Sequence, residues 1–293
     1  MRTVWALTRD TVNSFLDNGG LSRGAAIAFY AITSIGPVLL IIVAVAGLVL
    51  GEEAARGALM GKLEAIMGAQ AAGFLQSAIG SASNHGAGVI ATIVGIVSLI
   101  ITASGVFGEM QTALNVIWRA QPEGDTVGRL VRARLTSLGL VVALGFLLLV
   151  SLVLGTAVAA VGQQLNRIMP FSELLLHVLN SALSLAMLAV VVAAVYKVLP
   201  DCSLRWRDVL VGSVVTALLI TIGKLAIGIY IGHTALASSY GAAGSVLAAL
   251  FWVYYSAQIF LLGAEFTRVY ADARSARRHR GVQPVPASAS ARS

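Results

Sequence analysis

Charged residues are scarce in this chain. Only 11% of its 293 residues are Asp, Glu, Lys or Arg, while 58% are hydrophobic and the mean hydropathy is +0.87. About a quarter of the residues of a soluble domain are charged, so the composition excludes that class. Apolar runs of about 20 residues have the length that crosses a bilayer. The sequence therefore predicts an all-α, polytopic membrane protein with short amphipathic interfacial helices.

Cysteine is nearly absent, and so are the common catalytic motifs. A single cysteine, Cys202, excludes an intrachain disulfide. The sequence contains no GxxxxGK[ST], HExxH or CxxC pattern, and its four histidines lie far apart. Its carboxylates are scattered, whereas a metal-dependent nuclease needs clustered carboxylates to hold its ions. We therefore expect no catalytic residue, no metal site and no cofactor.

The long apolar runs divide the chain into segments. They predict a single six-helix domain over residues 1–268, with spans at about 25–50, 89–106, 135–161, 174–199, 209–231 and 246–266. Residues 1–23 have the pattern of an amphipathic helix at the membrane interface. Residues 51–86 predict two short amphipathic helices, or one helix broken at Gly68. Residues 269–293 predict a basic, disordered tail.

The distribution of basic residues predicts the orientation. With the N-terminus inside, 16 of the 20 Lys and Arg residues fall on the inner side of six spans. We therefore expect both termini to be cytoplasmic. The basic residues are expected to face the bilayer and its anionic lipid headgroups, and no specific nucleic-acid partner is predicted.

Two charges stand near the last two apolar runs, and they lie at different depths. Lys224 is expected in the outer third of the bilayer, where it either faces a polar cavity or extends its ammonium group outward to the interface. Glu265 is expected near the inner boundary, about 20 Å away along the membrane normal, so the two charges should not pair.

Two sets of polar residues are the candidate sites. The first set is predicted to line an intramembrane path for an amphiphile: Lys224, Tyr30, Ser34, Tyr254, Tyr255 and Gln258. The simpler interpretation is that such hydroxyl and amide groups cross-link neighbouring helices. The second set is predicted to form a polar cluster on the cytoplasmic side: Glu265, Glu109, Asn115 and Arg134. Pro37 is the expected bend of the first span, and Gly228 and Gly232 have the spacing of close helix packing.

Several stretches together resemble one known family. They include AAIAFYAITSIGPVLL (25–40), FGEMQTALNVIW (107–118), YKVLPDCSLRWRDVLVGSVV (196–215) and SYGAAGSVLAALFWVYYSAQIFLLGAEF (239–266). In order and over roughly residues 20–268, the chain resembles the YihY/BrkB family of bacterial inner-membrane proteins, formerly labelled ribonuclease BN. The resemblance implies a six-helix protein of the bacterial cytoplasmic membrane.

Three functions remain open at this point. The first hypothesis is envelope transport or lipid handling through a polar intramembrane cavity, with an amphiphile or lipid as substrate. The alternative is an envelope scaffold or interaction protein without transport activity, which predicts tight packing and an outward-facing Lys224. A membrane-bound ribonuclease ranks last, because the sequence shows no catalytic constellation.

Overall fold

The computed structural model describes residues 4–83, 105–120, 172–233 and 242–280, with six further positions between 139 and 150. All regular secondary structure in these ranges is helical. The predicted span 135–161 and nearly all of 89–106 lie outside the described residues. The all-α class is confirmed for the part of the chain that is described, and the count of six spans stays a prediction.

The chain begins with a helical elbow. Helix α1 (Val4–Asp17) is followed by the long helix α2 (Gly20–Leu50), and Gly19 between them has a φ of 68°, a left-handed conformation that favours glycine. Phe15 of α1 is buried, whereas Trp5 and Leu16 are exposed. The predicted N-terminal helix is therefore present, and its place at the membrane interface stays a prediction.

The segment after α2 folds as two short helices. They are α3 (Glu52–Met67) and α4 (Ala69–Ser83), separated by Gly68 with a φ of 85°. Such a φ is strained for residues with a side chain, so glycine ends the first helix where the sequence predicted a break. Of the two alternatives for residues 51–86, two helices is correct.

Three long helices complete the described part: α7 (Ser172–Val198), α8 (Trp206–His233) and α10 (Ala242–Arg280). Each contains a stretch long and apolar enough to cross a membrane, at Asn180–Val198, Trp206–Ile227 and Ala243–Ala276. These stretches overlap the predicted spans 174–199, 209–231 and 246–266, and the third extends beyond its predicted end.

The predicted disordered tail is wrong at its beginning. Helix α10 does not end at residue 268 but continues to Arg280. At 39 residues it is about 58 Å long, nearly twice the hydrocarbon thickness of a bilayer. The extension is stabilised by buried Val269 and by ion pairs from Arg268 to Asp272 and from Arg274 to Asp208. Residues 281–293 lie outside the described part.

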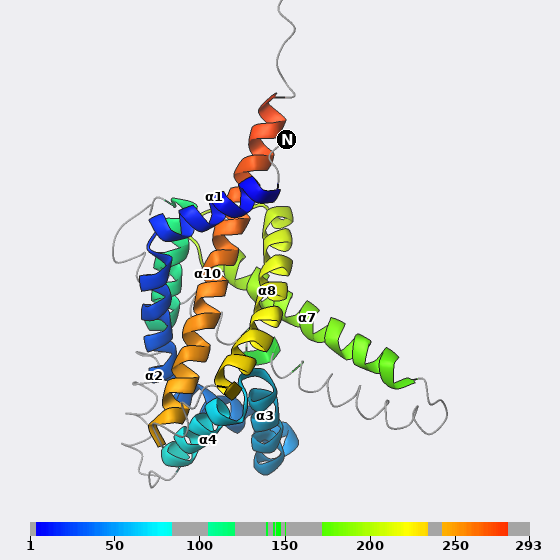
Figure 1. The fold of residues 1–293 in the computed structure, drawn as a ribbon. Helices are drawn as coiled ribbons and strands as arrows, with labels where there is room; N and C mark the ends of the chain where they lie inside the picture. Colours follow the sequence, from blue (N-terminus) through cyan, green and yellow to red (C-terminus); the bar gives the residue numbers. More distant parts are fainter. Residues whose placement is uncertain are drawn as a thin grey trace, which may run out of the picture.

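Helix α10 is the centre of the arrangement. It contacts α1, α2, α4 and α8, while α7 packs on α8. Figure 1 shows α1 lying across one end of α8 and α10, α3 and α4 gathered at the opposite end, and α7 projecting away from the other helices. We call the end that carries α1, the start of α8 and the C-terminal part of α10 the polar end.

Helices α8 and α10 approach each other closely along a seam of glycine and threonine. A Cβ atom added at Gly212 of α8 would collide with Thr267, and one added at Gly263 of α10 would collide with Thr216. The hydroxyl of Tyr196 on α7 lies 3.1 Å from that of Thr216 and donates a hydrogen bond of 2.6 Å to the carbonyl of Phe260. Small residues and interhelical hydrogen bonds are the usual means of packing helices in a membrane.

Candidate functional site

The first cluster of charged residues at the polar end is buried within the protein. Glu265 of α10 is 0% exposed and lies 3.3 Å from the guanidinium of Arg268, which is 9% exposed. The Asn18 side chain donates a hydrogen bond to Glu265, and Arg268 donates one to the Ser14 hydroxyl. We call these four residues the closed cluster.

The closed cluster fastens the N-terminal elbow to α10. Ser14 belongs to α1 and Asn18 to the elbow, where the Asn18 carbonyl also accepts a hydrogen bond of 3.0 Å from Arg23. A buried charge is strongly destabilising unless it is paired and hydrogen-bonded, and here both charges are. Because Glu265 is fully buried among these partners, its carboxylate is not accessible to a ligand. The closed cluster is therefore suited to holding α1 in place.

A second polar contact ties the loop between α7 and α8 to the helix over residues 105–118. The Asn115 side chain donates to Asp201 at 2.7 Å and accepts from the Asp201 backbone N–H at 2.8 Å. Gln111 donates to the same carboxylate at 3.1 Å. The loop that leads into α8 is therefore held in a fixed position.

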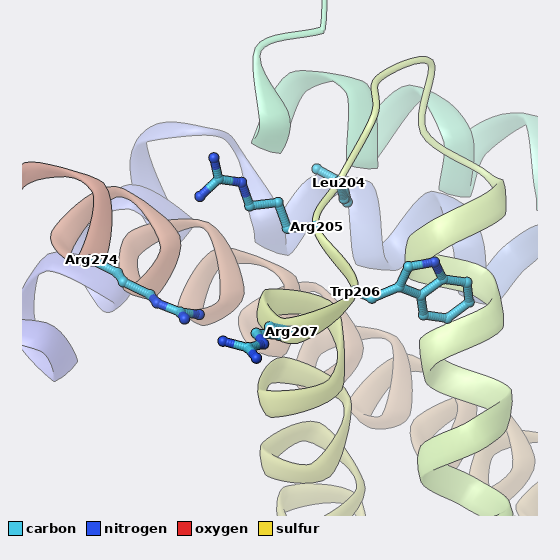
Figure 2. Close-up of a pocket in the computed structure, with 5 residues that line it drawn as sticks. All are labelled: Leu204, Arg205, Trp206, Arg207 and Arg274. Atoms are coloured by element: carbon cyan, nitrogen blue, oxygen red, sulfur yellow. The ribbon is translucent and has the colours of Figure 1, made fainter. Parts of the chain in front are cut away.

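Next to this loop lies an open, positively charged hollow. It has a volume of about 350 Å³ and is lined by Leu204, Arg205, Trp206, Arg207 and Arg274; we call it the basic depression. Figure 2 shows the guanidinium groups of Arg207 and Arg274 facing one another, with Arg205 extending from the preceding loop. Arg274 is anchored by an ion pair of 3.0 Å with Asp208. Arg205 and Arg207 are exposed.

One wall of the basic depression is fixed by packing against α7. Trp206 turns away from the arginines (Figure 2), and the Lys197 ammonium lies 5.4 Å from the centre of its ring. Lys197 also donates a hydrogen bond to the Leu204 carbonyl. A cation over an indole face is attractive, and indole rings favour the headgroup depth of a membrane. These contacts hold Trp206 and Leu204 in place while leaving Trp206 59% exposed.

An exposed apolar stripe runs along α8 from the basic depression. Successive members of the stripe are separated by three or four residues, so they lie on one helix face that begins at Arg207. They are all exposed: Val211, Val214, Leu218, Ile222 and Leu225. We call this face the α8 stripe, and its composition suits contact with lipid chains.

The only cysteine of the sequence, Cys202, lies in the loop beside the basic depression. Cys202 is half-buried, and burial, together with the neighbouring Asp201 carboxylate, raises the pKa of its thiol, while Lys197 lowers it by a smaller amount. Because the thiolate is the nucleophile, Cys202 is not arranged as a catalytic residue. Within the described ranges, no group of three or more His, Cys, Asp or Glu side chains is placed to hold a metal ion.

The predicted path residues do not meet at one place in the described part of the chain. Lys224 is exposed, beside Ile222 and Leu225 of the α8 stripe. Its neighbour Gly223 is buried against Tyr255 and Ile259, with a Cβ there only 2.7 Å from the Tyr255 ring. Tyr254 is partly buried on α10.

The remaining path residues have local partners. Ser34 is 4% exposed and donates to the Ala31 carbonyl at 3.1 Å, whereas Tyr30 is 40% exposed with its ring against Gly105. Gln258 donates to the Leu21 carbonyl at 3.1 Å and packs on Gly24. Of these contacts, only the hydrogen bond from Gln258 to Leu21 cross-links two helices, as the simpler interpretation expects, because the bond of Ser34 lies within α2.

The predicted cytoplasmic-side cluster is divided between different contacts. Glu265 belongs to the closed cluster, and Asn115 pairs with Asp201. Glu109 is partly buried on the helix over residues 105–118, and Arg134 lies outside the described residues. Helix α2 continues through Pro37, and α8 includes both Gly228 and Gly232.

Sequence reasoning missed the residues that define the basic depression. Arg205, Arg207 and Arg274 entered only as part of the charge count that predicts orientation. One signal was available, because Arg207 precedes Val211 and Val214 by four and seven residues and so shares their helix face. Arg274 gave no such signal, since it fell in the tail predicted to be disordered.

The helical architecture, with three helices long and apolar enough to cross a membrane, defines the class as a helical integral membrane protein. Within that class, the model of the family described as "Virulence factor BrkB" matches residues 11–286, so the chain belongs to the BrkB family. The earlier resemblance is thereby confirmed.

Relatives of this chain are also membrane proteins. It is 30% identical over 202 residues to a UPF0761 membrane protein of Tolumonas auensis, covering 66% of this chain and 62% of the relative. It is 31% identical over 196 residues to a UPF0761 membrane protein of Yersinia pestis, covering 64% and 62%. The matched part thus spans less than two thirds of these relatives. No solved structure matches.

Proposed function

We propose that this protein handles lipids, with the headgroup at the basic depression and the acyl chains along the α8 stripe. The observation that carries the proposal is the continuity of the two surfaces, because Arg207 stands at the head of the stripe. From Arg207 to Leu225 the helix rises about 27 Å, close to the roughly 30 Å hydrocarbon thickness. The stripe therefore crosses both leaflets, and a lipid with its headgroup at Arg207 would lay its acyl chains along the half of the stripe nearer the polar end.

Charge and side-chain chemistry support the same proposal. Exposed guanidinium groups recognise phosphate by paired hydrogen bonds, and Trp206 is a side chain of the membrane interface. From the Lys and Arg count we expect the polar end to face the cytoplasm, where anionic lipids attract basic segments. The proposal includes no catalytic step, and no ATP-binding motif occurs in the sequence. Movement of lipid would be passive, gradient-driven or coupled to a partner.

A proteoliposome assay of lipid transfer between leaflets tests the proposed function. We expect purified protein to accelerate the transfer of a fluorescent anionic phospholipid over protein-free vesicles. Arg207→Gln should slow transfer, whereas Arg9→Gln removes the same charge from exposed α1 and should not. Lys224→Met should leave the rate unchanged, because we propose that this exposed ammonium reaches the nearer interface. Equal transfer with and without protein would reject the function.

An envelope scaffold without transport activity is the second candidate. The close α8–α10 seam and the exposed Lys224 favour it, because a scaffold predicts tight packing and an outward-facing lysine. It differs from the first candidate in predicting no transfer of lipid by the purified protein. Co-purification of a stable partner from membranes that survives Arg207→Gln, together with inactive proteoliposomes, would support the scaffold.

A further inference from the structure

The charges around the basic depression do not cancel. Its lining contributes three guanidinium groups, from Arg205, Arg207 and Arg274, and the single carboxylate of Asp208 offsets one of them. Two positive charges remain at the lining. Behind it, Lys197 beside Trp206 and the Asp201 carboxylate of the same loop carry opposite charges. In the described part of the chain, neither Arg205 nor Arg207 is paired with a carboxylate. The hollow therefore fits a ligand with about two negative charges.

The placement of the arginines favours phosphate. Arg207 and Arg274 face one another across the hollow (Figure 2), so their two planar guanidinium groups can donate hydrogen bonds to the oxygen atoms of one phosphate. Asp208 fixes Arg274, and the α8–α10 seam fixes the spacing of the two helices. A phosphomonoester carries a charge of about −1.5 to −2 at pH 7, whereas a phosphodiester carries only one.

We propose that the basic depression is a binding site for lipid headgroups with a dianionic phosphate, a phosphomonoester or a diphosphate, and that it prefers them to phosphodiester lipids. This inference rests on the proposed lipid-handling function and names its headgroup class. The lipid, and not free phosphate, is the expected source of the group. Exposed Leu210 and the α8 stripe continue directly from the hollow and would receive the acyl chains.

Native mass spectrometry of the full-length protein in detergent tests the site. The probes are phosphatidate, phosphatidylglycerol with the same acyl chains, and inorganic phosphate. We expect phosphatidate to bind at least about tenfold more tightly than phosphatidylglycerol, because one further charge-assisted contact is formed. Arg207→Gln and Arg205→Gln should each weaken phosphatidate binding about tenfold. Both side chains are exposed, so the variants should fold.

Arg9→Gln is the matched control and should bind both lipids as the unchanged protein does. Equal affinity for the two lipids, or a preference that survives both substitutions, would overturn the site. Inorganic phosphate bound as tightly as phosphatidate would overturn the assignment to a lipid. Selective binding together with inactive proteoliposomes would remove the proposed function but keep the site. Transfer activity without selective binding would keep the proposed function but remove the site.

Discussion

At the polar end, α10 carries two arginines, Arg268 and Arg274, that are both paired with a carboxylate but lie in different surroundings. Arg268 belongs to the closed cluster, where Glu265, Ser14 and Asp272 surround it. Arg274, further along the same helix, lies in the basic depression, where Asp208 holds it but Arg205 and Arg207 stay exposed. The charges of the closed cluster are paired with one another, while the basic depression keeps an excess of positive charge at the surface.

This difference separates a structural role from a binding role. A buried charge must be paired within the protein, so its removal affects folding. An exposed and unbalanced charge contributes little to stability and remains available for a ligand. We therefore assign the closed cluster to the attachment of α1 and the basic depression to recognition.

The largest expected effect comes from opening the closed cluster. Glu265→Ala would remove the buried carboxylate beside Arg268 and leave only the longer ion pair of 3.7 Å to the exposed Asp272, so it should lower the free energy of unfolding by about 3–5 kcal/mol. Thermal unfolding in detergent, followed by tryptophan fluorescence, measures this loss. Glu265→Gln keeps a hydrogen-bond acceptor for Asn18 and should lose less. An unchanged unfolding temperature in Glu265→Ala would show that the cluster is not structural.

A smaller effect is expected from the seam that sets the distance between the two helices. Gly263→Ala places a methyl group against Thr216 and should destabilise the protein by about 1–3 kcal/mol. Because the seam fixes the spacing of Arg207 and Arg274, lipid binding should weaken as well. Gly57→Ala in α3 meets open space and should be neutral or stabilising by up to about 1 kcal/mol. Equal behaviour of the two variants would contradict the tight seam.

The smallest effect concerns the loop thiol beside the basic depression. Because burial and Asp201 raise its pKa, Cys202 should react with a maleimide more slowly than a free thiol at neutral pH. The rate should rise as the pH increases toward that raised pKa. In sealed vesicles, an impermeant maleimide should reach Cys202 only from the cytoplasmic side. Gln76→Cys, on exposed α4 and combined with Cys202→Ser, should label from the other side. Labelling of both from one side would reject the predicted orientation.

Local patterns in the sequence predicted local structure well. Apolar runs located α2, α7, α8 and α10, and the amphipathic pattern around Gly68 predicted the pair α3 and α4. The long helices follow from the length of each apolar run, and the break between α3 and α4 follows from the conformation that glycine can adopt. Both are properties of neighbouring residues in the sequence. The extension of α10 was missed because its support from Asp208 comes from another helix.

Long-range contacts were not predictable in the same way. Asn18 and Glu265 are 247 residues apart in the chain, and no periodicity connects them. The orientation of Lys224 was equally open, because in a membrane both the lipid-facing and the packed face of a helix are apolar. The packing of α8 on α10 through Gly212, Thr216 and Gly223 shows which face of α8 is buried.

The most direct test compares Glu265→Gln and Arg207→Gln in one detergent preparation, with unfolding temperature and bound phosphatidate both measured. The two charge groups should respond in opposite ways. Glu265→Gln should lower the unfolding temperature while the folded protein still binds phosphatidate. Arg207→Gln should unfold at the original temperature and bind phosphatidate about tenfold more weakly. The same change of both quantities in both variants would contradict the separation of a structural and a binding cluster.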